Sequence, residues 1–158
     1  MRTKRFWHIA IPVCIALWTA LIWGQSFVPA EKSTADSQVV EHLLPSDAQE
    51  IRVEPQWWTE PISKGAKYPI PMVVFVRKAA HFAEFAVLGM LWAVCRRLYP
   101  VRLTAAYGLV VGIVDEGIQH FTPGRGSVLS DVAIDTAGYL CGWALMALVL
   151  YLWYKKKK

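Results

Sequence analysis

The chain has 158 residues, of which 55% are hydrophobic and 18% charged, and its formal net charge is +5. Soluble domains average about 25% charged residues, and a mean hydropathy of +0.32 is high for such a domain. These figures exclude a disordered chain and a basic nucleic-acid-binding module, and they argue against a small enzyme with one water-soluble core. The length fits one compact unit.

Four apolar stretches are each long enough to cross a bilayer, which takes about 20 mostly apolar residues. They cover about residues 6–23, 72–95, 103–121 and 131–154. Basic residues precede the first stretch, and residues 28–30 loosely match the cleavage site of a signal peptide, but the stretch is longer than the usual apolar core of a signal peptide. We therefore expect a retained helix. The sequence predicts an all-α integral membrane protein, with residues 1–158 forming a single membrane domain built as a bundle of four transmembrane helices.

Basic residues without accompanying acids flank these spans on one side. Ten of them, with no acid among them, lie in three segments: Arg2, Lys4, Arg5, Arg96, Arg97, Arg102 and the four lysines at 155–158. Such flanks mark the cytoplasmic side of a membrane protein, so the pattern predicts a multi-pass protein with both ends in the cytoplasm (N-in/C-in). Residues 24–71, between the first two helices, would then form an extracytoplasmic loop, and the turn 122–130 would lie on the same side.

Five acids remain outside that loop, and all fall inside the spans or at their outer ends: Glu84, Asp115, Glu116, Asp131 and Asp135. A charge at the centre of a lipid-embedded helix costs at least about 2.5 to 3.5 kcal/mol, so these acids must face one another, basic residues or water. Helical spacing places them on shared faces with polar residues and glycines. The three stripes are Lys78, His81 and Glu84; Gly108, Gly112, Asp115 and Gln119; and Asp131, Asp135, Gly138 and Gly142. Glu116 and His120 form an i, i+4 pair beside the second stripe.

These stripes predict a polar pocket in the outer half of the bundle, and three interpretations of it remain open. In the first, Arg77 or Arg125 forms a structural ion-pair network with the carboxylates of the spans. In the second, the same arginines, with Lys78 and His81, bind the anionic head group of a lipid, since arginine holds phosphate through paired hydrogen bonds.

In the third interpretation the pocket is an enzyme site. His81 with Glu84 or Asp115 would perform acid–base chemistry or hold a divalent metal. A His-x-x-Glu step on a helix can place two ligands on one face, but alone it is a weak signal. The sequence contains no nucleophile elbow, phosphate-binding loop, His-Glu-x-x-His step or cysteine motif. Whether a reaction is catalysed, and whether a metal cofactor is bound, therefore stays open at this level.

Three blocks of sequence resemble the VanZ-like family of bacterial membrane proteins. They are RKAAHFAEFAVLG from 77, DEGIQHFTPGRGS from 115 and LSDVAIDTAGYLCG from 129. The resemblance covers about residues 77–142, together with Gln25 and Ser26, where the family often has a polar, Ser-rich step. Phe85 stands where tyrosine is common, and the loop 24–71 lies outside the family's core pattern.

The resemblance implies a protein of the bacterial plasma membrane that acts at the cell envelope. Because the namesake is linked to teicoplanin resistance, an antibiotic-resistance role affecting glycopeptide susceptibility is expected, with membrane lipids and a lipid-linked or lipopeptide-type ligand as partners. The implied site residues are Arg77, Lys78, His81, Glu84, Asp115, Glu116, Gln119, Arg125, Asp131 and Asp135. Head-group binding is the favoured function. A membrane-embedded hydrolase of a lipid phosphate and a structural partner subunit are the alternatives.

Overall fold

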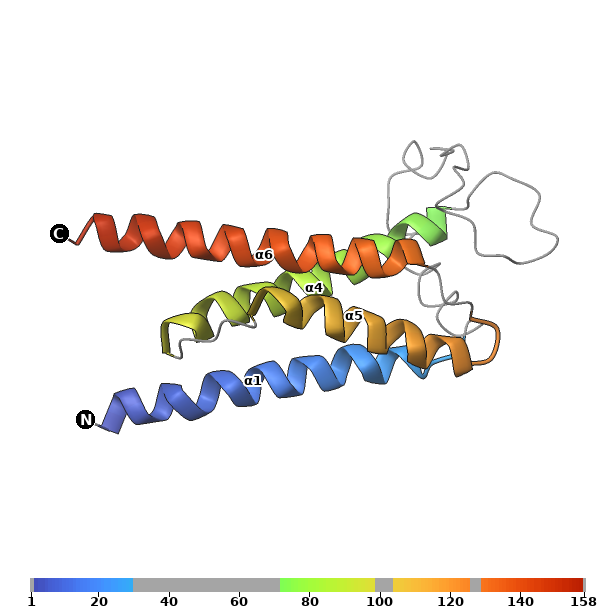
Figure 1. The fold of residues 1–158 in the computed structure, drawn as a ribbon, viewed down its shortest axis with the longest axis horizontal. Coiled ribbons are helices and arrows are strands. Elements are labelled where there is room, and N and C mark those ends of the chain that lie inside the picture. Colours follow the sequence, from blue (N-terminus) through green and yellow to red (C-terminus); the bar gives the residue numbers. More distant parts are fainter. Residues whose placement is uncertain (1, 30–71, 99–103, 126–128, 158) are drawn as a thin grey trace.

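The computed structural model describes residues 2–29, 72–98, 104–125 and 129–157. Within them the chain forms four helices, which follow the four apolar stretches: α1 (Arg2–Ser26), α4 (Met72–Leu98), α5 (Thr104–Phe121) and α6 (Leu129–Lys155). The all-α class is thus confirmed, and the described residues contain no strand. Figure 1 shows the helices side by side, with the start of α1 and the end of α6 at the same end of the bundle. Most of the predicted loop 24–71 lies outside the described residues.

In the described part of the chain, three helices are long and apolar enough to cross a membrane: Phe6–Ser26, Phe75–Cys95 and Leu129–Lys155. The fourth, α5, has 18 residues and is not among them. Its second half carries Asp115, Glu116, Gln119 and His120, which lower its mean hydropathy. The protein is therefore a helical membrane protein, while a spanning α5 and the N-in/C-in orientation stay predictions.

Glycines set the close approach of α4 and α6. Gly138 and Gly142 lie directly against the backbone of Phe82 and Ala86 on α4, so that a Cβ at either glycine would overlap α4 itself. Gly89 of α4 lies in the same way against the backbone of α6. Small residues allow such contact between helices in lipid, where burial of apolar surface supplies little driving force. The predicted glycine stripe of the last helix therefore faces α4.

Tyr139 joins α5 to this pair. Its side chain is fully buried, its ring packs on Gly108, and its hydroxyl donates a hydrogen bond to the backbone carbonyl of Thr104. One turn along α5, a Cβ at Gly112 would lie 3.4 Å from the Asp135 Cβ. The polar and glycine stripe of α5 thus faces α6, which brings the carboxylates of the two helices to the same interface.

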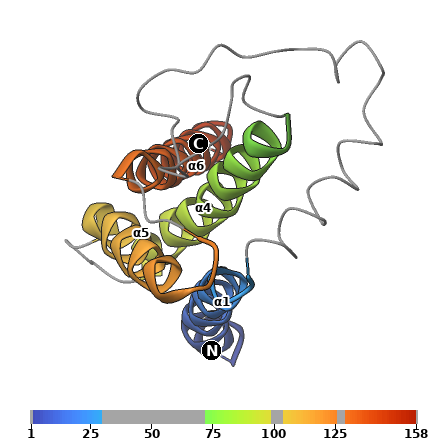
Figure 2. The ribbon, with the colours of Figure 1, turned by 90° about the vertical axis from the view of Figure 1, so that its right-hand side faces the viewer.

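α1 contacts α4 and α5 through polar side chains at intervals along its length. The indole of Trp18 donates a 2.9 Å hydrogen bond to the backbone carbonyl of Glu84 on α4. The indole of Trp23 donates a 3.3 Å bond to the Val111 carbonyl on α5, and the hydroxyls of Thr19 and Tyr107 lie 3.0 Å apart. In end view, α4 and α5 lie between α1 and α6 (Figure 2).

Candidate functional site

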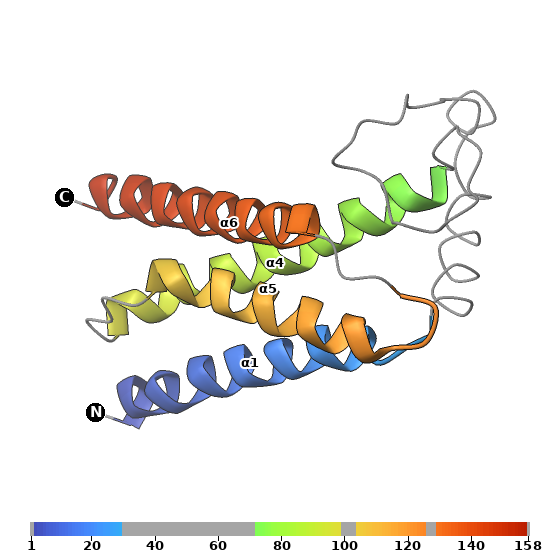
Figure 3. The ribbon, with the colours of Figure 1, turned by 45° about the vertical axis from the view of Figure 1, so that its right-hand side comes forward.

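The polar residues gather at the end of the bundle opposite the two chain ends. There α1 and α5 end and α6 begins, and the first half of α4 passes alongside (Figure 3). The turn after α5 is fastened to the end of α1, because the Thr122 hydroxyl donates a 2.8 Å hydrogen bond to the backbone carbonyl of Ser26. All four helices therefore contribute to this end.

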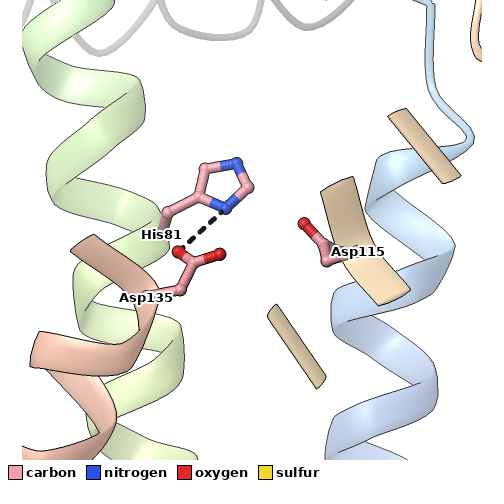
Figure 4. Close-up of side chains that lie close together, drawn as sticks. All are labelled: His81, Asp115 and Asp135. Atoms are coloured by element: carbon pink, nitrogen blue, oxygen red, sulfur yellow. Dashed lines mark ion pairs between the residues drawn. The ribbon is translucent and has the colours of Figure 1, made fainter. Parts of the chain in front are cut away.

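The centre of the site consists of one histidine and two carboxylates from three helices: His81 of α4, Asp115 of α5 and Asp135 of α6. Each offers one ligand-type atom, and these atoms all lie within 4.8 Å of one another. Both aspartates are fully buried, and His81 Nδ1 lies 3.7 Å from an Asp135 carboxylate oxygen. Figure 4 shows the His81 ring and the two carboxylates converging on one space between the helices.

Asp115 is held in place by hydrogen bonds to both of its carboxylate oxygens. The Ser26 hydroxyl donates to Oδ1 at 2.6 Å, and the Gln119 amide, one turn further along α5, donates to Oδ2 at 2.8 Å. Each carboxylate oxygen has two acceptor positions, and these two bonds occupy one position on each oxygen. The two hydrogen bonds therefore orient the Asp115 carboxylate.

Asp135 is buried in a different way. Within the described residues, neither of its carboxylate oxygens accepts a hydrogen bond, and His81 Nδ1 has no hydrogen-bond partner there. The large majority of buried side-chain polar atoms have such a partner, and an unsatisfied buried charge costs free energy. The 3.7 Å separation of the two groups exceeds a hydrogen bond. Among the described residues, the centre of the site therefore holds no group that donates a hydrogen bond to Asp135, although His81 lies within ion-pair distance of it.

An ion pair lies beside the centre, on the side of α4 and α6. Lys78 forms a salt bridge with Asp131, and the side chains are 16% and 18% exposed. The Ser130 hydroxyl donates to the same carboxylate at 3.3 Å. The sequence had offered Arg77 or Arg125 as the partner of this acid. The structure assigns Lys78 instead, one turn before His81 on α4.

Two arginines lie at the edge of the site. Arg125 follows Gly124, whose φ of 74° is a conformation that favours glycine, and its Nε is buried with no hydrogen-bond partner in the described residues. Burial lowers the pKa of the Arg125 guanidinium, as does the charge of Arg77, while Asp115 and Glu116 act in the opposite direction. The charge of Arg77 therefore acts against that of the partly buried Arg125 guanidinium.

The remaining predicted residues surround this arrangement. The Glu84 carboxyl lies within hydrogen-bonding reach of the Gln25 side chain and within electrostatic range of Asp115, but it is not in the central group of three. Glu116 is buried, whereas His120, one turn further on, is exposed and packs edge-on against Phe121. The structure thus brings the predicted residues to one end of the bundle and separates them into a centre and a rim.

Charge counting missed the uncharged donors. Ser26 was indicated only by the family resemblance, and Thr122 was not predicted as part of the site. A hydroxyl in an apolar stretch costs little and leaves no signal in the charge pattern. The sequence feature that could have indicated them is their position along the chain. Ser26 follows the first apolar stretch and Thr122 follows the third, which carries Asp115.

Residues 12–151 match the protein-family model described as VanZ/LLP1. The matched range begins in α1, ends in α6 and includes every residue of the site. No curated protein and no solved structure matched the chain.

Proposed function

The chain belongs to the VanZ/LLP1 family, and from that premise we propose that it is a multi-pass protein of the bacterial plasma membrane that binds the anionic head group of a lipid. The proposed binding site is the rim of the polar cluster formed around His81, Asp115 and Asp135, and it includes Arg77 and Arg125. The observation that carries this proposal is the buried Nε of Arg125, which has no hydrogen-bond partner among the described residues. The charge of Arg77 acts on the same guanidinium.

The proposed topology has four spans, with both chain ends in the cytoplasm. Besides the basic flanks, it is supported by the outward face of α5, where Val110 and Ile113 are 54% and 55% exposed. Such side chains match a lipid environment. The 18 residues of α5 give a helix about 27 Å long at 1.5 Å per residue, close to the roughly 30 Å hydrocarbon core. In this topology the polar cluster lies toward the extracytoplasmic surface.

The charges at the rim favour an anion. The charge of Arg77 repels that of Arg125, and partial burial removes some of the water that would screen the two charges. A phosphate oxygen between them would remove this repulsion and accept the unpartnered N–H through a charge-assisted hydrogen bond. The central carboxylates lie deeper, between α4, α5 and α6. A head group would therefore sit above them, with its acyl chains along the apolar outer face.

Native mass spectrometry of the delipidated full chain, titrated with phosphatidylglycerol or phosphatidylcholine, tests the proposal. We expect the wild-type chain to retain one phosphatidylglycerol and to retain phosphatidylcholine less. Arg125→Ala should weaken the binding of phosphatidylglycerol by about tenfold or more, since a hydrogen bond to a charged group contributes about 1.5–3 kcal/mol. Lys156→Ala is the matched control, because it removes the same charge at the other end of the bundle. Equal losses in the two variants would show general attraction to basic residues and contradict a site at the rim.

The effect on glycopeptide susceptibility is a second part of this proposal. It rests on the family's namesake and on the extracytoplasmic position that the proposed topology gives to the site. Cells that produce the wild-type chain should become less susceptible to teicoplanin, and cells with equal membrane levels of the Arg125→Ala variant should not. Equal susceptibility of these two strains would show that the effect on teicoplanin does not depend on the head-group site.

A membrane-embedded hydrolase of a lipid phosphate is the second candidate. The observation in its favour is His81 beside Asp115 and Asp135, an imidazole with two carboxylates that can exchange protons with a substrate. Release of inorganic phosphate from a defined lipid phosphate, lost in His81→Ala and in Asp115→Asn, would establish it. Head-group binding without any release in the wild-type chain would exclude the hydrolysis of that lipid.

A further inference from the structure

We propose that His81, Asp115 and Asp135 form a binding site for one divalent transition-metal cation, held between α4, α5 and α6. This site is distinct from the head-group site at the rim, and it goes beyond the function proposed above. The inference rests on three observations: the geometry of the three donors, the unsatisfied state of Asp135 and His81, and the hydrogen bonds that orient Asp115.

The geometry fits a metal centre. Metal–ligand bonds of about 2.1 Å in a tetrahedral site place neighbouring ligand atoms about 3.4 Å apart. The distance from His81 Nδ1 to the Asp135 oxygen is 3.7 Å, and the ligand atoms of all three residues lie within 4.8 Å of one another. Small side-chain rotations would bring the three donors to coordination distance. Each residue comes from a different helix (Figure 4), so the donors surround the central space.

Asp135 supplies the second line of evidence. It is fully buried, and among the residues that the structure describes nothing donates a hydrogen bond to either of its oxygens. A cation in contact with an Asp135 oxygen and His81 Nδ1 would provide both groups with the partner they lack. Two carboxylates with one neutral imidazole carry a charge of −2, which a divalent cation offsets in full. A cation would also reduce the repulsion between Asp115 and Asp135.

The hydrogen bonds to Asp115 are of the kind that accompany metal ligands. Carboxylates that bind metals are usually fixed by outer partners, and loss of such a partner weakens metal binding about 10- to 100-fold. Ser26 and Gln119 hold the two oxygens of Asp115 at 2.6 and 2.8 Å. These bonds use one acceptor position of each oxygen, and the second position of an oxygen is what a cation needs.

The donor set indicates which cations fit. One imidazole nitrogen and two carboxylate oxygens suit Zn²⁺, Fe²⁺ or Mn²⁺. Mg²⁺ demands near-octahedral oxygen coordination and keeps several waters, so a site of three protein ligands with a histidine suits it poorly. Three protein ligands leave at least one coordination position for water or another ligand. We therefore expect Zn²⁺ to bind more tightly than Mn²⁺, and Mn²⁺ more tightly than Mg²⁺.

The test uses the full chain without an affinity tag, purified in detergent and stripped of metal with a chelator. Equilibrium dialysis against Zn²⁺, with elemental analysis, should give one Zn²⁺ per chain. His81→Ala and Asp135→Asn should each weaken binding by at least tenfold, and Ser26→Ala by about 10- to 100-fold. His120→Ala is the matched control, because His120 is exposed and lies outside the cluster. It should bind Zn²⁺ like the wild type.

Three results would overturn the proposal. One is substoichiometric Zn²⁺ on the wild-type chain, the second is unchanged binding in His81→Ala, and the third is an equal loss in His120→Ala. If the variants fail to fold, the wild type still decides: its melting temperature must rise with Zn²⁺, and Co²⁺ bound in its place must give the visible absorption of a low-symmetry nitrogen–oxygen site. Arg125→Ala should bind Zn²⁺ normally, so the metal site and the head-group site can fail separately.

Discussion

Ser26 and Asp115 lie 89 positions apart in the chain and are joined by a 2.6 Å hydrogen bond in which the serine hydroxyl donates to the carboxylate. The bond connects the end of α1 to the most enclosed acid of α5. α1 contributes no charge to the centre of the site, yet through this bond it fixes the direction of a central carboxylate. The stability of the bundle and the geometry of the site are therefore linked at this position.

Ser26→Ala is expected to destabilise the protein by about 1.5–3 kcal/mol, because a buried carboxylate oxygen loses its donor. Unfolding in mixed micelles by SDS titration measures the change. Ser130→Ala is the control, since the Ser130 hydroxyl donates to Asp131 at a longer 3.3 Å in a partly buried position. It should cost less than about 1 kcal/mol. Equal effects of the two substitutions would show that the Ser26 hydrogen bond contributes no more to the free energy of unfolding than the Ser130 one.

Gly142→Ala should disrupt the α4–α6 pair, because its Cβ would overlap the Ala86 backbone and one helix would have to move. Overpacking typically costs about 1–3 kcal/mol, and overlap with a backbone places this site at the upper end. Gly117→Ala is the matched control: a Cβ there meets nothing within 4 Å. Alanine is the better helix former by about 1 kcal/mol, so this variant should unfold at the same or higher SDS fraction. A stable Gly142→Ala protein would contradict the packing.

Tyr139→Phe should cost about 0.5–1.5 kcal/mol, since it removes the hydrogen bond to the Thr104 carbonyl and keeps the buried ring. Tyr139→Ala should cost about 3–5 kcal/mol, because it opens a cavity beside Gly108. The same SDS titration compares the two variants. Similar losses would show that the hydroxyl, and not the ring, holds α5 in place.

Lys78 and Asp131 should show a favourable coupling in a double-mutant cycle. Their side chains are mostly shielded, and polar pairs between membrane helices average about 0.6 kcal/mol. We expect a coupling free energy of at least that size. Lys78→Ala alone should destabilise more than the double variant Lys78→Ala/Asp131→Ala, because it leaves a shielded carboxylate without its cation. Additive single changes would show that the pair contributes nothing.

Much of the site could be predicted from the sequence because lipid makes every charge conspicuous. His81, Asp115 and Asp135 were all placed on inward faces by spacings of three and four residues, and the structure brings them together. The pairing of individual groups was not predictable. Lys78 and not an arginine pairs with Asp131, since the choice depends on side-chain reach across the α4–α6 interface, and a one-dimensional pattern carries no information about reach.

The helix boundaries also include a part that the sequence predicted and a part that it did not. The described parts of α4 and α5 begin at Met72 and Thr104, near the apolar stretches predicted from about 72 and 103. α1 continues three residues beyond the predicted end, through Gly24 and Gln25 to Ser26. Hydropathy detects where the lipid ends, whereas the backbone hydrogen bonds of a helix continue into polar sequence. That extension is what carries Ser26 to Asp115, so the part of α1 that the apolar pattern omitted is the part that meets the site.

The indole of Trp18 recognises the backbone carbonyl of Glu84 and makes no use of the glutamate side chain. A carbonyl is present whatever residue occupies position 84. The Trp18 contact therefore places no restriction on that side chain, which interacts instead with Gln25, seven residues further along the same helix. A substitution at position 84 would therefore leave the Trp18 hydrogen bond between α1 and α4 in place.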